Sequence, residues 1–135
     1  MFGDADKLPP DARANYDRWR ALGEVRAWDD GAIAERVQDG DVALVIDAVF
    51  GTGLTRSAAP IVAKTYGAMT QRCYVRNRPC VAVDVPSGLC SDSGRDLGRA
   101  LPANLTVTFH TPKPGHVLDQ GPLLCGELRL KDIGL

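Results

Sequence analysis

Apolar positions recur along the chain with two different periods, which predict helices and strands in alternation. Apolar residues at helical spacing predict helices over 12–22, 33–37 and 58–72. Pro10 precedes the first of these helices and Gly23 follows it, as start and stop signals of a helix do. The second is expected to end near Gly40.

Short β-rich runs lie between these helices. Strands are predicted over Val25–Trp28, Val42–Asp47, Cys80–Val85, Leu105–Phe109 and Glu127–Ile133. The second run is apolar throughout, which is typical of a strand covered on both faces. The last run alternates apolar and charged residues, as an edge strand does. Strands separated by helical stretches favour right-handed βαβ crossovers, and so an α/β fold with a mostly parallel sheet.

Composition narrows the function classes. The 135 residues fit one domain, 1–135, and carry 16 basic against 17 acidic residues, a net charge of −1. Without a basic run we expect no nucleic-acid partner, and without an apolar run of about 20 residues we expect no membrane span. The first residues lack the basic-then-apolar order of a signal peptide. We therefore expect a soluble, cytoplasmic protein.

The four cysteines form no C-x-x-C pair, so free thiols are expected rather than a zinc site. Cys80 is expected to pack as a small apolar residue where a strand begins. The segment Ser91–Gly98 has few apolar residues and is predicted to be an exposed loop.

Two predicted strands end in an aspartate followed by a glycine-containing turn, VIDAVFGTGL and VAVDVPSGL. Because ligands bind outside the carboxyl ends of parallel strands, Asp47 and Asp84 are candidate site residues. For Asp47 two interpretations stay open. It either faces a ligand or a cation, or it accepts hydrogen bonds from the turn that follows it.

The turn after Asp47 has two glycines one residue apart and precedes a predicted helix. Its backbone amides are candidates to hold a phosphate. The residues concerned are Gly51, Thr52, Gly53, Leu54, Thr55, Arg56 and Ser57. Taken alone, a G-x-G pair favours an ordinary strand-to-helix turn.

The turn after Asp84 is more specific. Pro86 keeps Val85 extended and so holds Asp84 where the strand leaves it. A carboxylate beside the oxygens of Ser87 suits proton transfer or an alkali-metal site, and a structural Asx turn is the alternative.

A third polar segment follows the Leu105–Phe109 strand. Its Lys113 is a candidate to balance the charge of Asp84 or to contact a phosphate. We expect His116 to be a surface or loop residue, because nothing near it in sequence supplies the partner that a base needs.

Together these segments resemble the N-terminal (YjeF-type) domain of NAD(P)H-hydrate epimerase. The family's motifs D-A-x-F-G-T-G-L, D-x-P-S-G-L, T-V-T-F, K-x-G-H and D-I-G match, in order, Asp47–Leu54, Asp84–Leu89, Thr106–Phe109, Lys113–His116 and Asp132–Gly134. The resemblance covers essentially the whole chain. It implies a Rossmann-like three-layer αβα sandwich and an isomerase that interconverts the R and S epimers of hydrated NADH or NADPH, a form of cofactor repair.

The resemblance also implies roles for single residues. Asp47 and Ser87 match ligands of a potassium ion, and Gly51–Ser57 matches a stretch that holds the hydrated cofactor. Asp84 matches a carboxylate that contacts the substrate. We expect Asp84 to be catalytic, exchanging a proton with the hydroxyl on the epimerising carbon, which typically contributes 10²–10⁴ in rate.

The sequence departs from the family at two places. It lacks the N-N-G-G-D segment of the family's first βα turn, and Asn104 stands where the family usually has an aspartate. We therefore expect an N-terminally truncated domain without a dehydratase domain, with reduced or lost activity. A non-catalytic binding or scaffolding domain is the main alternative, and an unrelated nucleotide-binding enzyme a weaker one. A sheet edge left uncovered in this way would also favour a homodimer or aggregation.

Overall fold

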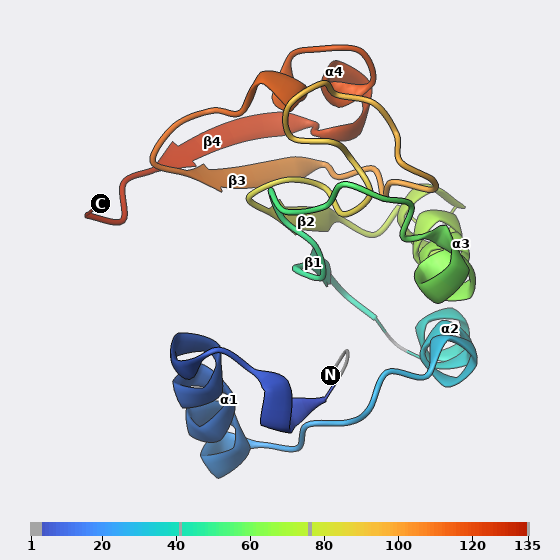
Figure 1. Ribbon diagram of the computed structural model, residues 1–135. Coiled ribbons are helices and arrows are strands. Elements are labelled where there is room, and N and C mark those ends of the chain that lie inside the picture. The colour runs from blue at the N-terminus through green and yellow to red at the C-terminus, as the bar shows by residue number, and fades with distance from the viewer. Residues whose placement is uncertain (1–3, 41, 76, 135) are drawn as a thin grey trace.

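Four parallel strands form the sheet of this protein (Figure 1). The computed structural model describes residues 4–40, 42–75 and 77–134. The strands are β1 (Val45–Asp47), β2 (Cys80–Val83), β3 (Leu105–Phe109) and β4 (Glu127–Lys131). They lie in the order β1-β2-β3-β4, and each pairing is parallel. This confirms the predicted α/β class, a Rossmann-like sandwich with a parallel sheet.

The three long α-helices lie where the apolar spacing predicts them, and the structure adds three short helices that were not predicted. They are the 3₁₀ helices η1 (Ala5–Lys7) and η2 (Pro114–His116) and the α-helices α1 (Pro10–Leu22), α2 (Asp30–Asp39), α3 (Ala59–Val75) and α4 (Gly121–Leu124). Pro10 occupies the first turn of α1, and the carboxylate of Asp29 caps α2 by accepting the Ala32 N–H at 2.9 Å. Gly23 and Gly40 directly follow α1 and α2, as predicted.

Helices α2 and α3 lie side by side at one end of the sheet (Figure 1) and are joined by polar contacts near both ends of α2. The Asp30 carboxylate accepts the backbone N–H groups of Lys64 and Thr65 at 2.9 and 2.8 Å. Near the other end, the buried Arg72 side chain donates from Nε to the carbonyl oxygen of Val37 at 2.5 Å. The Val37 carbonyl lies in the last turn of α2, where helix ends leave carbonyl groups unpaired.

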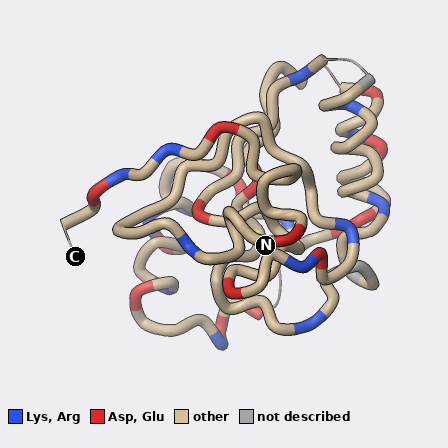
Figure 2. The backbone as a smooth tube through the Cα atoms, turned by 90° about the horizontal axis from the view of Figure 1, so that it is seen from above, with Lys and Arg blue, Asp and Glu red and all other residues tan. Residues whose placement is uncertain are grey.

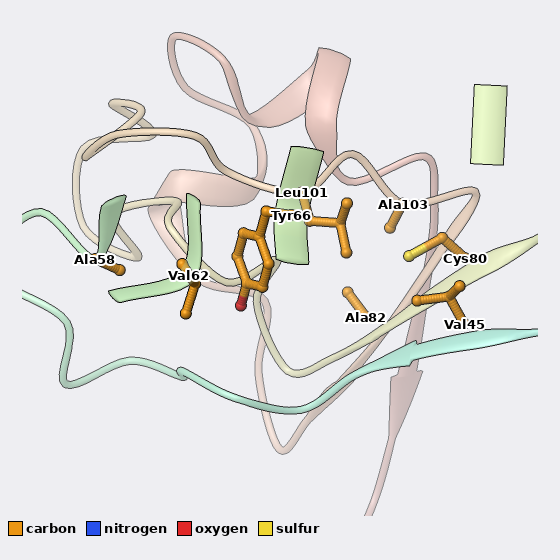
Figure 3. Packing of buried hydrophobic residues seen from close by; sticks show 8 residues of the cluster. All are labelled: Val45, Ala58, Val62, Tyr66, Cys80, Ala82, Leu101 and Ala103. Carbon is orange, nitrogen blue, oxygen red and sulfur yellow. The ribbon is translucent and has the colours of Figure 1, made fainter. Parts of the chain in front are cut away.

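The main core lies between α3 and one face of β1 and β2 (Figure 3). Its buried residues are Val45, Ala58, Val62, Tyr66, Cys80, Ala82, Leu101 and Ala103. The expectation that Cys80 packs as an apolar residue is confirmed. Its side chain is fully buried, and burial raises the pKa of its thiol to about 12.

Four strand predictions need correction. The run Glu127–Ile133 forms a strand only as far as Lys131. Residues 25–28 form no strand, because no described strand lies beside them to pair with their backbone. The run Val42–Asp47 forms a strand only over β1 and is covered on one face, since Val45 is 4% exposed and Ile46 is 61% exposed. Strand β2 stops at Val83 because Asp84 has φ = 69°, a left-handed conformation that no strand continues through.

Two other segments differ from one another in how they pack. Helix α1 stands apart from the sheet and has no buried residue (Figure 1). The segment Ser91–Gly98, predicted to be exposed, is partly built into the fold, because Ser91 is buried and Gly94 lies against the backbone of Leu118.

None of the described helices has the length and apolarity needed to cross a bilayer.

Basic and acidic residues are interspersed along the whole backbone (Figure 2). Most ion pairs found in the described residues are between well-exposed side chains. The pair of Lys113 and Asp84 is different, with side chains 18% and 22% exposed. That pair lies where the two central strands of the sheet end.

Candidate active site

The two predicted aspartates lie at the carboxyl ends of neighbouring strands. Asp47 is the last residue of β1 and pairs in register with Ala82 of β2, and Asp84 directly follows β2. Both carboxylates are therefore presented at the edge of the sheet where parallel α/β folds bind ligands.

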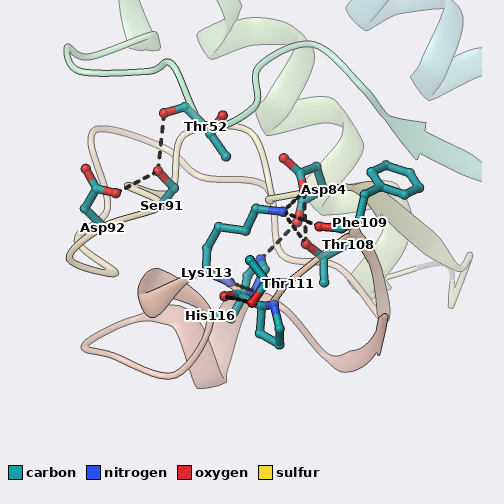
Figure 4. Close-up of polar contacts among 10 residues, drawn as sticks. Thr52, Asp84, Ser91, Asp92, Thr108, Phe109, Thr111, Lys113 and His116 are labelled. Atoms are coloured by element: carbon teal, nitrogen blue, oxygen red, sulfur yellow. Dashed lines mark hydrogen bonds and ion pairs between the residues drawn. The ribbon is translucent and has the colours of Figure 1, made fainter. Parts of the chain in front are cut away.

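Asp84 is held by two side-chain donors from the β3 region (Figure 4). Its Oδ1 accepts from Lys113 Nζ at 2.5 Å and from Thr108 Oγ1 at 2.9 Å. Partial burial acts to raise the pKa of Asp84, but the hydrogen bonds from Lys113 and Thr108 outweigh burial. The pKa of Asp84 therefore lies below its ordinary value, and the carboxylate is ionised at neutral pH.

The ammonium group of Lys113 is used within the chain. Besides Asp84 it donates to Thr108 Oγ1 at 2.9 Å and to the carbonyl oxygen of Phe109 at 3.0 Å. A lysine has three donors, and these three acceptors account for all of them. Of the two roles predicted for Lys113, the geometry therefore favours charge balance with Asp84 over contact with a phosphate.

His116, expected to be a surface or loop residue, lies in η2 of the connection between β3 and β4 but is buried, with 3% of its area exposed. Its Nε2 lies 2.9 Å from the carbonyl oxygen of Asp84, and its Nδ1 accepts the Lys113 N–H at 3.0 Å. The burial of His116 was not predicted because its partners are backbone groups, one of them 32 positions away. The neighbouring Gly115 lies so close to the carbonyl oxygen of Cys90 that a Cβ at this position would clash with it.

Asp47 sits in a different environment. It is 2% exposed, and its Oδ2 accepts the backbone N–H of Ser87 at 2.7 Å while its Oδ1 accepts from Tyr66 Oη at 3.4 Å. Burial raises the pKa of Asp47, against the hydrogen bonds from Ser87. Ser87 Oγ in turn accepts the Phe50 N–H at 2.8 Å, so the two predicted metal-site residues tie the two loops together.

The predicted cofactor-binding turn surrounds a hollow of about 520 Å³. The hollow is lined by Val49, Phe50, Gly51, Gly53, Leu54, Thr55, Arg56, Ser57 and Ala58. Thr52 alone of the predicted segment is not in this lining, and its carbonyl oxygen accepts from Ser91 Oγ at 3.3 Å (Figure 4). A Cβ on Gly51 would lie 3.9 Å from Asp84 Oδ2, so the hollow and the Asp84 cluster meet at Gly51.

The structure thus groups the predicted residues into two sets, Asp84 beside Gly51 and Asp47 with Ser87. Thr108 and Tyr66, which complete these sets, were not predicted from the sequence. The sequence does contain a hint of Thr108. The strand Leu105–Phe109 has threonines at two alternate positions where apolar residues are usual. Both threonines are buried, and Thr106 Oγ1 donates to the carbonyl oxygen of Cys125 at 2.7 Å.

A parallel sheet with polar turns at its carboxyl edge is the arrangement at which α/β proteins bind small molecules. Comparison with known proteins makes this specific, because the family described as YjeF-related protein N-terminus matches residues 1–115. The chain belongs to this family.

Curated relatives match the chain over its full length. An NAD(P)H-hydrate epimerase of Rhodobacter capsulatus is 38% identical over 140 residues, and the match spans 56% of that protein. An NAD(P)H-hydrate epimerase of Roseobacter litoralis is 33% identical, with 63% of it covered. A bifunctional NAD(P)H-hydrate repair enzyme Nnr of Vibrio cholerae is 35% identical, with 26% covered. The chain therefore spans between about a quarter and two thirds of the length of these relatives.

Proposed function

We propose that this chain carries the epimerase site of an NAD(P)H-hydrate epimerase, an isomerase of cofactor repair that acts on hydrated NADH and NADPH. The observation that carries the proposal is the Asp84–Lys113 pair beside the Gly51–Ser57 hollow. The family membership supports the proposal, and so do the names of three relatives that match this chain over all of its residues.

The geometry suits an exchange of hydroxyl between the two faces of a ring. Thr108 and Lys113 both bond to Oδ1 of Asp84, while Oδ2 is the oxygen nearest Gly51. Because Asp84 is ionised, its Oδ2 is suited to accept a proton from the water that adds to the ring carbon. In the reverse step the protonated carboxyl gives that proton to the hydroxyl, which leaves as water while the lone pair of the ring nitrogen forms a C=N bond. Lys113 keeps the carboxylate charged and fixed in place during this exchange.

The Gly51–Ser57 turn is the proposed binding segment for the hydrated cofactor. A Cβ added to Gly53 would meet no atom within 4 Å, and Gly53 has no left-handed φ, so the fold itself does not need a glycine there. A glycine without a structural cause is consistent with close approach of a ligand to the backbone.

Potassium is the proposed cation of the Asp47–Ser87 set. No group of three or more histidine, cysteine or acidic side chains lies together in the described ranges, but Asp47 and Ser87 offer only oxygen, which suits a hard cation. The buried Asp47 carboxylate accepts the Ser87 N–H at 2.7 Å and the Tyr66 hydroxyl at 3.4 Å, and both donors are neutral groups. A potassium ion bound there would supply the positive charge that this buried carboxylate needs.

Two smaller predictions remain proposals as well. The free cysteines at 73, 80, 90 and 125 are compatible with a reducing compartment, the cytoplasm. The exposed Leu44 and Ile46 of the β1 region, 46% and 61% exposed, are the surface through which a homodimer would form. Light scattering after size exclusion measures whether the chain forms one.

The substitution Asp84→Asn tests the function. It keeps the side-chain volume and removes proton exchange, so epimerisation of hydrated NADH, followed by chromatographic separation of the two epimers, should fall about 10²–10⁴-fold. Asp119→Asn, at an exposed aspartate that also has a left-handed φ, is the matched control and should keep the wild-type rate. An Asp84→Asn protein with near wild-type turnover contradicts the catalytic role. A wild-type chain that binds the hydrate without turnover supports the binding-domain alternative.

A further inference from the structure

His116 connects the two members of the Asp84–Lys113 ion pair, although its own side chain touches neither charged group. It ends η2, is 3% exposed, and packs beneath the loop that follows β2 (Figure 4). Its two ring nitrogens contact two backbone groups, one belonging to Asp84 and the other to Lys113. The proposed function leaves the role of this histidine open.

The two contacts define one protonation state of the ring. The Asp84 carbonyl oxygen can only accept, so Nε2 carries the hydrogen and donates across 2.9 Å. The Lys113 N–H can only donate, so Nδ1 must be an unprotonated acceptor at 3.0 Å. Burial lowers the pKa of His116 and so favours the same neutral form. A single tautomer, with hydrogen on Nε2, satisfies both partners.

The contact to Asp84 acts on a strained residue. Asp84 has φ = 69°, a left-handed conformation that is uncommon for a non-glycine residue and persists only where its surroundings hold it. Its N–H donates to the carbonyl oxygen of Val107 at 2.8 Å, and its own carbonyl oxygen accepts from His116. Without His116, one of these two restraints is lost and Asp84 can relax toward the extended backbone of β2, which turns its carboxylate away from Lys113.

The contact to Lys113 acts on the other partner. The backbone N–H of Lys113 donates to His116 Nδ1, and the ammonium group at the end of the Lys113 side chain donates to Asp84 Oδ1. One imidazole ring therefore fixes the backbone of both partners in the ion pair.

From these contacts we infer that His116 is the positioning residue of the Asp84 site, a role that rests on the proposed function. It is not the proton-transfer group itself, because both ring nitrogens are occupied by the backbone and the ring is shielded from solvent. It acts by keeping Asp84 in its left-handed conformation, where the carboxylate meets both Lys113 and the Gly51 turn.

Two amide substitutions separate the two contacts. His116→Gln places an N–H near the position of Nε2 and keeps the bond to Asp84, whereas His116→Asn places an acceptor near Nδ1 and keeps only the bond to Lys113. We expect His116→Asn to lower kcat about 10²-fold with little change in KM, the cost of a small misplacement of a catalytic group. His116→Gln should lose only a few-fold. His110→Asn, at the exposed second histidine, is the matched control.

Nuclear magnetic resonance of the full chain supplies a readout that does not depend on turnover. The ¹⁵N shifts of wild-type His116 should show the neutral tautomer with hydrogen on Nε2. The carboxyl pKa of Asp84 should rise toward its ordinary value in His116→Asn and stay low in His116→Gln and His110→Asn. The other tautomer, or an Asp84 pKa that does not move in His116→Asn, overturns the inference.

The outcomes keep the inference separate from the proposed function. If the wild-type chain shows no epimerase turnover, the proposed function fails, and the tautomer and the Asp84 pKa still decide whether His116 positions Asp84. If turnover is present and His116→Asn keeps the wild-type kcat, the positioning role fails while the epimerase assignment stands.

Discussion

Asp47 and Asp84 end neighbouring strands in similar sequence contexts, yet the fold gives them opposite environments. Asp84 has a cationic partner, side-chain exposure of 22% and a lowered pKa. Asp47 is 2% exposed, is bonded to Ser87 and Tyr66, and has a raised pKa. An aspartate followed by a glycine turn therefore does not specify one chemistry. What the neighbouring loops supply decides whether such a carboxylate lies beside a lysine or is buried among neutral hydrogen-bond donors.

The contrast predicts that stability depends more on Asp47 than on Asp84. Asp47→Ala leaves the buried Ser87 N–H and Tyr66 hydroxyl without their acceptor, which should lower the free energy of unfolding by about 1–3 kcal/mol. Urea denaturation measures the loss. Asp39→Ala, at an exposed carboxylate of α2, should have an effect within about 0.5 kcal/mol. A loss at Asp47 no larger than at Asp39 would remove its structural role.

Because the backbone of Asp84 is strained, we expect glycine to be more stabilising than alanine at this position, the reverse of their order within a helix. At φ = 69° an alanine pays the left-handed penalty and a glycine does not, so Asp84→Gly should be about 1 kcal/mol more stable than Asp84→Ala. At Glu35, exposed within α2, the order should reverse, because glycine is the poorer helix former. Unfolding both pairs in urea compares them. The same order at both sites would mean that Asp84 is not strained.

The two carboxylates should also give stability opposite dependences on pH. The lowered pKa of Asp84 means that its contribution is present above the unfolded value of about 3.9 and is lost as the pH falls through the folded pKa. The raised pKa of Asp47 means that the native state holds that proton more tightly, so stability falls as the pH rises from about 3.9 through the folded pKa. Unfolding free energies of Asp84→Asn and Asp47→Asn between pH 3 and pH 7 should therefore deviate from wild type in opposite directions.

Potassium sharpens the same comparison. A cation beside Asp47 favours its ionised form, so potassium should raise Tm more at pH 7 than at pH 4, relative to tetramethylammonium at equal ionic strength. The difference should vanish in Asp47→Asn and persist in Asp84→Asn. Equal melts in both salts at pH 7 would argue against the cation site.

The smallest expected effect on stability is at Gly53. Open space surrounds it, so Gly53→Ala should change the free energy of unfolding by less than about 0.5 kcal/mol while weakening binding of hydrated NADH at least about tenfold. Calorimetric titration and urea denaturation measure the two quantities. Gly115→Ala is the counterpart, because its Cβ would meet the Cys90 carbonyl oxygen and so lower stability directly. Unchanged affinity in Gly53→Ala would place the ligand elsewhere.

The sequence predicted the elements that depend on local signals. Helices α1, α2 and α3 and strands β3 and β4 follow apolar spacing and nearby prolines or glycines. It did not predict that β1 is covered on one face only, because coverage depends on which elements pack on the sheet. The contact of His116 with Asp84 was missed for a similar reason, since a backbone carbonyl 32 positions away leaves no trace in side-chain identity.

The polar contacts between α2 and α3 have a consequence for local unfolding. Because Asp30 accepts two amides of α3 and Arg72 of α3 holds the carbonyl oxygen of Val37 in α2, neither helix can detach without exposing buried polar groups of the other. The pair should open as one cooperative unit in native-state hydrogen exchange, with similar protection in both helices. Helix α1, which buries no residue, should exchange far faster and independently of that unit.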